Sequence, residues 1–162
     1  MDLKCSHLET PLGPMLLAAS AQGLAGAWFE GQQHMPNFDA WAIDRQNPHL
    51  KQAAHELTDY FSGARAPFKV RLSAAWGTAF QHAVWKALQG IRCGQTTSYG
   101  QLALQLKKPM ASRAVGAAVG KNPWSIIVPC HRVIGANGHL TGYAGGLDRK
   151  EWLLRHEGAL LL

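Results

Sequence analysis

Apolar residues in the first half of the chain form two short runs that predict a β-hairpin. The runs are Met15–Ala19 and Leu24–Phe29, and the residues between them include a turn candidate at 21–23 that ends in glycine. Two apolar runs of strand length around a short turn are typical of antiparallel strands. Residues 31–47 are rich in Gly, Gln, Asn and Pro, and we expect them to form a loop.

A helix and a further strand are predicted after this loop. From His49 to Phe61 apolar side chains recur at helical spacing, and Gly63 follows as a candidate C-cap. The residues Phe68–Leu72 have the composition of a short strand. The first half is therefore predicted to be a small antiparallel sheet with one helix.

The second half contains three predicted helix starts. In each, Ser, Thr or Asp stands three residues before Gln or Glu, as in the capping box at helix N-termini. These sequences are Thr78–Gln81, Ser98–Gln101 and Asp148–Glu151. Apolar residues follow each of them, and Gly90 and Gly158 mark the expected ends of the first and third helices.

A helix-turn-helix is predicted in the middle of the second half. It combines a helix at 98–107, a break at 108–111 and a second helix with Ser112 as its N-cap. Apart from Arg113, the second helix is almost entirely Ala, Val and Gly, so it offers no row of Arg, Asn or Gln to read base edges. Small side chains permit either close approach to DNA or tight packing in a core.

Charge is distributed unequally along the chain. Residues 1–76 contain six Lys and Arg against seven Asp and Glu, whereas residues 77–162 contain ten against three, within a total net charge of +6. A basic second half favours a polyanion partner such as nucleic acid, although an ordinary basic surface gives the same count. Charge and element pattern together predict an α/β (α+β) chain of two domains, 1–76 and 77–162, the second mainly helical.

Composition argues against several classes of protein. Hydrophobic residues make up 47% of the chain, too many for a disordered protein. No apolar run reaches the roughly 18 residues that a membrane span needs, and no secretory signal is expected. The three cysteines, Cys5, Cys93 and Cys130, are odd in number and widely spaced. This pattern disfavours disulfides and structural zinc and favours a reducing cytosol.

The candidate for chemistry is Pro129-Cys130-His131-Arg132. The thiolate is the nucleophilic form of cysteine, and a nearby base or cation raises its population near neutral pH. His131 can supply the base and Arg132 the positive field. Adjacent residues often point apart, so these residues alone leave open a buried structural cysteine.

Motifs on both sides of Cys130 resemble those of the O6-alkylguanine-DNA alkyltransferases. The similarity runs from Thr78 to Gly158 and is specific, because separated motifs agree in order. These motifs are Ser98-Tyr99, residues 112–116, Asn122-Pro123, and residues 129–133, 142–146 and 150–158. The first half fits loosely, through residues 10–14, and the resemblance implies a ribonuclease H-like domain there.

The resemblance implies a role in alkyl transfer for five residues. Cys130 is the expected alkyl acceptor, His131 the group that activates it through a bound water, and Glu157 the group that orients the histidine. Tyr99 is expected to protonate the departing guanine, and Asn122 to be a hinge between the recognition helix and the active-site strand. Without the resemblance, Glu157 could be a surface charge, Tyr99 a core aromatic and Asn122 a helix C-cap.

The resemblance also implies that the second helix of the helix-turn-helix contacts DNA. The reacting atom lies inside a duplex, so the damaged base must be flipped out, and Arg113 is expected to fill the gap. Repair must not depend on sequence, which fits a helix without base-reading side chains. The other expected minor-groove contacts are Tyr99, Ser112, Ala114, Gly116 and Ala117.

The substrate pocket implied by the resemblance contains Val133, Tyr143, Ala144 and Gly145. Some relatives have serine where this chain has Ala144, so a hydrogen bond to the guanine oxygen is expected to be missing. One branch of the family binds zinc through cysteine and histidine in the first half. Here Cys5 stands without such partners, and we expect neither a metal nor an organic cofactor.

The implied function is irreversible, single-turnover transfer of an alkyl group from O6-alkylguanine, and from O4-alkylthymine, to Cys130 in double-stranded DNA. The protein is expected to act as a cytoplasmic monomer with no membrane partner. The alternative is a non-catalytic sensor that binds alkylated DNA and recruits other repair proteins; non-reactive relatives have tryptophan in place of the cysteine. A cysteine hydrolase would need an oxyanion hole, for which the sequence has no signal.

Overall fold

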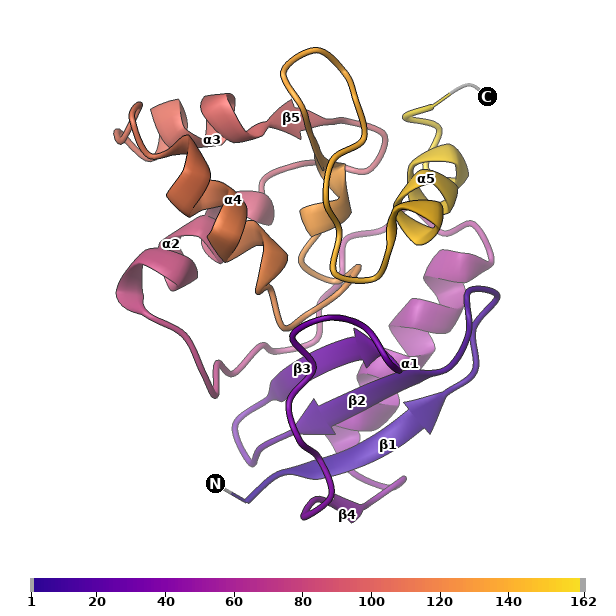
Figure 1. Ribbon diagram of the computed structural model, residues 1–162. Coiled ribbons are helices and arrows are strands. Elements are labelled where there is room, and N and C mark those ends of the chain that lie inside the picture. The colour runs from indigo at the N-terminus through magenta and orange to yellow at the C-terminus, as the bar shows by residue number, and fades with distance from the viewer. Residues whose placement is uncertain (1, 161–162) are drawn as a thin grey trace. The chain divides into compact units, whose positions relative to one another are not determined.

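The computed structural model describes residues 2–160 and divides the chain into two compact units, residues 1–76 and 77–162. Figure 1 shows a sheet with one helix in the first unit and a mainly helical second unit. This combination confirms the predicted α/β fold class.

The first unit is built on a mixed sheet. Its strands are β1 (Lys4–Leu8), β2 (Met15–Ala19), β3 (Leu24–Phe29) and β4 (Ala42–Ile43), in the spatial order β3-β2-β1-β4. The predicted hairpin β2–β3 is confirmed, β1 is antiparallel to β2, and β4 is parallel to β1. β1 was not predicted because Lys4, Ser6 and His7 interrupt its apolar positions. The two-residue strand β4 lies inside the expected loop.

Helix α1 (Pro48–Phe61) matches the predicted helix closely. It starts where the Asn47 side chain accepts hydrogen bonds from the backbone N–H groups of His49 and Leu50. It ends at Ser62, and Gly63 follows in the left-handed conformation with φ of 107°. The glycine expected as the C-cap therefore lies one residue beyond it, at the position where helices often end in this conformation.

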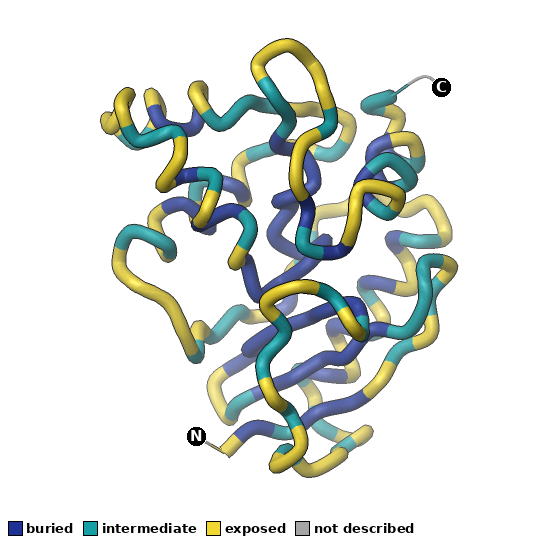
Figure 2. Tube along the Cα trace, viewed as in Figure 1, coloured by how far each residue is buried: buried dark blue, intermediate teal, exposed yellow. Residues whose placement is uncertain are grey.

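Strand β2 is buried along its whole length because both faces of the sheet are covered (Figure 2). α1 packs against one face, and the loop after β3 crosses the other (Figure 1). On the loop side, a buried cluster of sheet residues contacts Met35, Phe38 and Trp41. The continuous apolar run that predicted this strand is typical of a sheet covered on both faces.

The strand predicted at Phe68–Leu72 is wrong. Only Leu72 forms a β-bridge, with Leu24. The backbone N–H groups of Lys69 and Val70 donate instead to the Glu56 carboxylate, at 2.9 and 3.1 Å. A side chain on α1 therefore takes the donors that a longer ladder would have used.

The second unit contains the predicted pair of helices and a short parallel ladder. In chain order its elements are α2 (Ala79–Leu88), β5 (Thr97–Ser98), α3 (Tyr99–Gln105), α4 (Ser112–Gly120), the 3-10 helix η1 (Cys130–Arg132), β6 (Val133–Ile134) and α5 (Leu147–His156). α3 and α4 pack together as the two helices of the helix-turn-helix. The Trp85 indole of α2 donates to the carbonyl of Ala118 at 2.8 Å and ties α4 to α2.

Two of the three predicted capping boxes hold the expected first bond. At α2, Thr78 and Gln81 satisfy each other's backbone N–H groups, so the capping box is complete. At α3, the Ser98 side chain accepts from the backbone of Gln101 at 3.1 Å, but the Gln101 side chain accepts from the Thr97 hydroxyl instead. The start of α3 is therefore capped from one side only.

The other two predicted N-caps are wrong. Ser112 is the first residue of α4, and Ala111 occupies the N-cap position without a side-chain hydrogen bond. At α5 the N-cap is Gly146, with φ of 94°, and Asp148 lies in the first turn. An aspartate there still stabilises the helix, because its charge lies near the positive end of the helix dipole.

Candidate active site

Cys130 begins η1 at the end of a buried and irregular segment. Directly before Cys130, residues 125–127 form a turn, and the two-residue strand β6 begins only at Val133. Ile126 has φ of 71°, a left-handed conformation that a β-branched residue rarely adopts. Hydrogen bonds from Ile127 to Ser125 and from Val128 to Trp124, both 2.9 Å, hold this turn. Unusual backbone conformations of this kind occur preferentially at functional sites.

Asn122 connects the end of α4 to the segment before Cys130. Its buried side-chain amide donates to the carbonyls of Trp124 and Val128, at 3.2 and 2.8 Å, and its oxygen accepts from the Trp124 N–H at 3.0 Å. The C-cap of α4 is Lys121, so Asn122 is not that cap. These hydrogen bonds link the end of α4 to the segment before Cys130, which is where the hinge is expected.

The Cys130 thiol is buried, with 6% of the residue exposed. Burial raises the pKa of the thiol, whereas the nearby Asn122 amide and the positive charge of Lys150 act in the opposite direction. A free thiolate is therefore not the resting state. The site needs a base that removes the proton when a substrate is present.

Glu157 joins His131 and Arg132 in one buried ion network. Its carboxylate accepts from His131 Nε2 at 2.7 Å and from Arg132 Nε and Nη2 at 2.8 and 3.0 Å. Burial raises the pKa of Glu157, but the hydrogen bonds and charges of the two partners outweigh it and hold this pKa well below its usual range. The alternative of a surface charge is wrong, because the Glu157 side chain is fully buried.

The hydrogen bond to Glu157 determines which nitrogen of His131 can act as a base. Burial lowers the pKa of His131, although its hydrogen bond to Glu157 acts in the opposite direction. The ring is therefore neutral, and its single proton lies on Nε2 because a carboxylate can only accept. Nδ1 then keeps its lone pair, and it is buried with no hydrogen-bond partner among the described residues. It is the available base next to Cys130 in the chain.

Lys150 is a buried cation that the sequence interpretation did not assign to the site. Its ammonium donates to the carbonyls of Val133 at 2.5 Å, Thr141 at 2.6 Å and Gly142 at 3.4 Å. Burial lowers the pKa of Lys150 to about 8, and negative charge at Cys130 would raise it. Lys150 precedes the buried residues Leu153, Leu154 and Glu157 by three, four and seven positions. This helical spacing puts it on the buried face of α5. That spacing was the signal available in the sequence.

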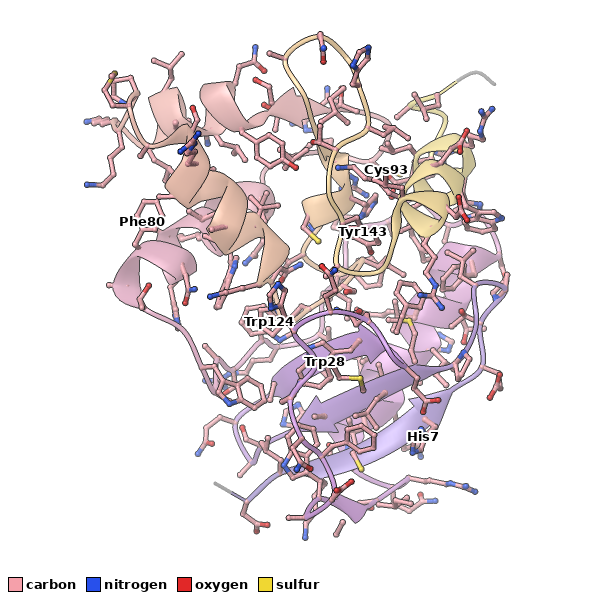
Figure 3. The ribbon with its side chains drawn as sticks, viewed as in Figure 1. His7, Trp28, Phe80, Cys93, Trp124 and Tyr143 are labelled. Carbon is pink, nitrogen blue, oxygen red and sulfur yellow. The ribbon has the colours of Figure 1, made fainter. Side chains whose placement is uncertain are left out.

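The residues of the predicted pocket lie on β6 and in the last part of the loop between β6 and α5. Val133 is buried in β6, and Tyr143 is buried on the segment that leads into α5 (Figure 3). Burial raises the pKa of Tyr143 well above its usual value, and a negative charge at Cys130 raises it further. Ala144 is half-buried, and the carbonyl of the buried Gly145 accepts from Arg149 at 3.0 Å.

Helix α4 presents its small side chains outward. Ala114 and Ala117 are exposed together with Arg113, whereas Val115, Ala118 and Val119 are buried. Ser112 is half-buried at the start of the helix. The alternative of a helix packed in the core on all sides is therefore wrong. The outer face is smooth apart from one long cationic side chain, so a nucleic-acid backbone can approach it closely.

Tyr99 lies between α4 and the loop before α5. It is the first residue of α3 and is half-exposed, so it is not simply a core aromatic. Its ring faces Gly116, where a Cβ atom would lie 3.6 Å from it. Its hydroxyl accepts a hydrogen bond from the Thr141 hydroxyl at 3.1 Å. The phenol is thus held at an accessible position beside α4, the helix expected to contact DNA.

A separate cavity of about 530 Å³ lies elsewhere in the second unit, between the ends of α2 and α3 and residues 95–97. None of the predicted site residues lines it. Within residues 2–160, no helix is long and apolar enough to span a membrane, and no three His, Cys, Asp or Glu side chains gather to hold a metal ion. None of the three cysteines, all of which the structure describes, forms a disulfide.

The fold and this site define a class of protein. Residues 3–74 match the family model described as 6-O-methylguanine DNA methyltransferase, ribonuclease-like domain, and residues 79–159 match its DNA binding domain. The chain belongs to the 6-O-methylguanine DNA methyltransferase family.

Individual relatives are similar over nearly the whole chain. A protein of Salmonella typhimurium named methylated-DNA--protein-cysteine methyltransferase is 48% identical over 96% of this chain and 95% of its own length. A protein of the same name from Methanosarcina acetivorans is also 48% identical, over 93% of this chain and 96% of its own. The crystal structure of the Mycobacterium tuberculosis O6-methylguanine methyltransferase is 43% identical with a TM-score of 0.88, covering 97% of this chain and 93% of that one. Another structure from that organism is a complex with DNA; it is 42% identical with a TM-score of 0.88, covering 98% of this chain and 94% of that one.

Proposed function

We propose that this protein repairs alkylated DNA by moving the alkyl group from O6-alkylguanine, and from O4-alkylthymine, to Cys130. The observation that carries the proposal is a buried thiol followed by a neutral histidine whose Nε2 is fixed on Glu157. The name of these relatives, methylated-DNA--protein-cysteine methyltransferase, supports the same reaction. We assign DNA binding and alkyl transfer to residues 77–162.

The reaction starts with loss of the Cys130 proton. The proton passes through a water molecule to Nδ1 of His131, and Glu157 stabilises the resulting imidazolium. The thiolate sulfur then attacks the alkyl carbon, and the bond between that carbon and O6 breaks. The electron pair of the broken bond remains on guanine. Lys150, fixed against the same segment, favours the thiolate through its charge.

Guanine leaves more easily when a ring nitrogen receives a proton during this step. Tyr99 is the proposed donor, since its half-exposed hydroxyl is held at the start of α3. Tyr143 and Val133 are proposed to form the wall of the pocket nearest Cys130, with Ala144 and Gly145 at its edge. Asn122 is the proposed hinge that keeps the Cys130 segment attached to α4.

Duplex DNA is proposed to lie with its minor groove against α4. Ser112, Ala114, Gly116 and Ala117 allow the close approach, and Arg113 enters the stack when the damaged base flips out. The complex of the Mycobacterium tuberculosis relative with DNA supports this class of partner. We further propose that the protein acts as a monomer in the cytoplasm, where cysteines that form no disulfide stay reduced.

Replacing Arg113 by alanine should separate base flipping from chemistry. We expect repair of O6-methylguanine in a duplex to slow by about tenfold or more. Unstacking the base costs a few kcal/mol, and without Arg113 no side chain fills the gap that stabilises the flipped state. Reaction with free O6-benzylguanine base should change less than about twofold, since a free base needs no flipping. Rates of lesion loss and of benzyl incorporation provide the comparison. Equal losses with both substrates would show that Arg113 acts in the pocket instead.

The test of the proposed function is the stoichiometry of transfer. The S-alkyl cysteine has no good leaving group, so each chain should accept one alkyl group and then stop. Excess alkylated duplex is mixed with a known amount of protein, and lesion loss should reach a plateau at one per chain. Mass spectrometry should place the added mass on the peptide that contains Cys130. Continued loss would mean a turnover enzyme, and binding without any loss would support the alternative of a damage sensor.

A further inference from the structure

The loop between β6 and α5, residues 135–146, is tied to the core at its two ends by Lys150. One ammonium group binds the carbonyl of Val133 before the loop and those of Thr141 and Gly142 near its end. The loop backbone at Thr141 is therefore fixed even though the residue itself is exposed. Figure 1 shows the loop rising beside β5 and the start of α3.

The position of Tyr99 relative to this loop is fixed by a strand pair. β5 runs parallel to β6, with Thr97 opposite Val133 and Ser98 opposite Ile134, and Tyr99 follows at once as the first residue of α3. The Thr141 hydroxyl then reaches the Tyr99 hydroxyl at 3.1 Å and donates to it. The backbone is thus held on both sides of a contact between residues that are 42 positions apart.

We propose that Thr141 is a positioning residue that directs the Tyr99 proton to the leaving guanine. The proposal rests on the proposed function. A phenol has one proton, so once Tyr99 donates it to a ring nitrogen of the base, its oxygen can only accept. Thr141 is placed to donate to that oxygen.

The hydrogen bond should strengthen during the reaction. As the bond between the alkyl carbon and O6 breaks, its electron pair stays on guanine and the Tyr99 proton moves to the ring nitrogen. Negative charge then grows on the phenol oxygen, and hydrogen bonds to charged acceptors are about twice as strong as neutral ones. The phenolate recovers its proton from solvent after the base has left.

The first test compares Thr141→Val with Thr141→Ser. Valine keeps the shape and removes the hydroxyl, whereas serine keeps the donor. With duplex O6-methylguanine, Thr141→Val should lower the second-order rate constant of transfer by about three- to tenfold. Thr141→Ser should stay within about twofold of the wild-type chain, because its donor is retained. Thermal unfolding and binding to undamaged duplex, measured alongside, should be unchanged in both.

Two further measurements distinguish proton positioning from a structural role. In a Tyr99→Phe background, Thr141→Val should cause no additional loss, because the group on which it acts is absent. Reaction of Cys130 with iodoacetamide should proceed at the wild-type rate in Thr141→Val, because iodide leaves without a proton.

Three results would overturn the role of Thr141: wild-type transfer by Thr141→Val, the same loss in the Tyr99→Phe background, or a slowed reaction with iodoacetamide. A wild-type chain that transfers no alkyl group would instead refute the proposed function itself. The two failures are therefore distinguishable in one set of assays.

Discussion

A chain in which Cys130 is replaced by alanine should bind duplex DNA containing O6-methylguanine and leave every lesion in place. The reason is chemical, because alanine has no nucleophile and nothing in the proposed relay can accept an alkyl carbon in its place. Lesion counts after long incubation should equal those without protein. Binding to the same duplex, measured by fluorescence anisotropy, should remain, since Cys130 is buried and α4 is unchanged.

The matched control is Cys93→Ala. Cys93 is a half-buried cysteine in the same unit that forms no disulfide and lies outside the proposed chemistry. This variant should still accept one alkyl group per chain at the wild-type rate. Loss of lesions with Cys130→Ala, or loss of transfer with Cys93→Ala, would contradict the assignment of Cys130 as the acceptor.

Replacing Glu157 by alanine should lower the free energy of unfolding by about 3–5 kcal/mol, because Arg132 and His131 would stay buried without their partner. Glu157→Gln keeps the shape but cannot accept from both residues as a carboxylate does. This milder variant should fold and transfer about a hundredfold more slowly, since the histidine loses the group that fixes its proton on Nε2. Urea titration and single-turnover rates measure the two effects.

Glu151→Gln is a control on the same helix. Glu151 pairs with Arg155 at 2.6 Å on the exposed side of α5, and an exposed pair of this spacing contributes only about 0.3–0.5 kcal/mol. This variant should unfold within about 0.5 kcal/mol of the wild-type chain and transfer normally. If the changes at Glu151 and Glu157 lowered the free energy of unfolding equally, the buried network would stabilise the fold no more than an exposed ion pair does.

The stability lost at Glu157 should also depend on pH in a defined direction. Its pKa in the folded chain lies below the usual value of about 4.3. A depressed carboxyl pKa contributes stability that is fully present above the unfolded value and is lost as pH falls through the folded one. The difference between the wild-type chain and Glu157→Gln should therefore be constant near neutral pH and shrink in acid, below about pH 4.3.

The parts of the fold predicted from sequence were those with strong local signals. β2, β3 and α1 have clear periodicity, and the start of α2 has a complete capping box. β1 was not predicted because it forms by pairing with β2 and has no continuous apolar run of its own. The strand expected at 68–72 was lost to Glu56, a side chain from a distant helix that no local pattern reveals.

The candidate site was likewise predicted only in part from the sequence. The resemblance pointed to Cys130, His131 and Glu157, and the structure shows the last two in contact. It did not reveal that Arg132 shares the Glu157 carboxylate, nor that the buried Lys150 ammonium binds backbone carbonyls. Both depend on tertiary contacts across the unit, although the spacing of Lys150 on α5 was a hint.

The smooth outer face of α4 has a consequence for how a lesion would be found. A helix face of alanine and glycine forms almost the same contacts at every base step, and attraction to the phosphates does not vary with sequence. The energy of the complex then changes little as the protein moves along the duplex. With so little variation in binding energy, the protein is not held at any undamaged site. It leaves the extrudability of the damaged base as the main feature that stops the search.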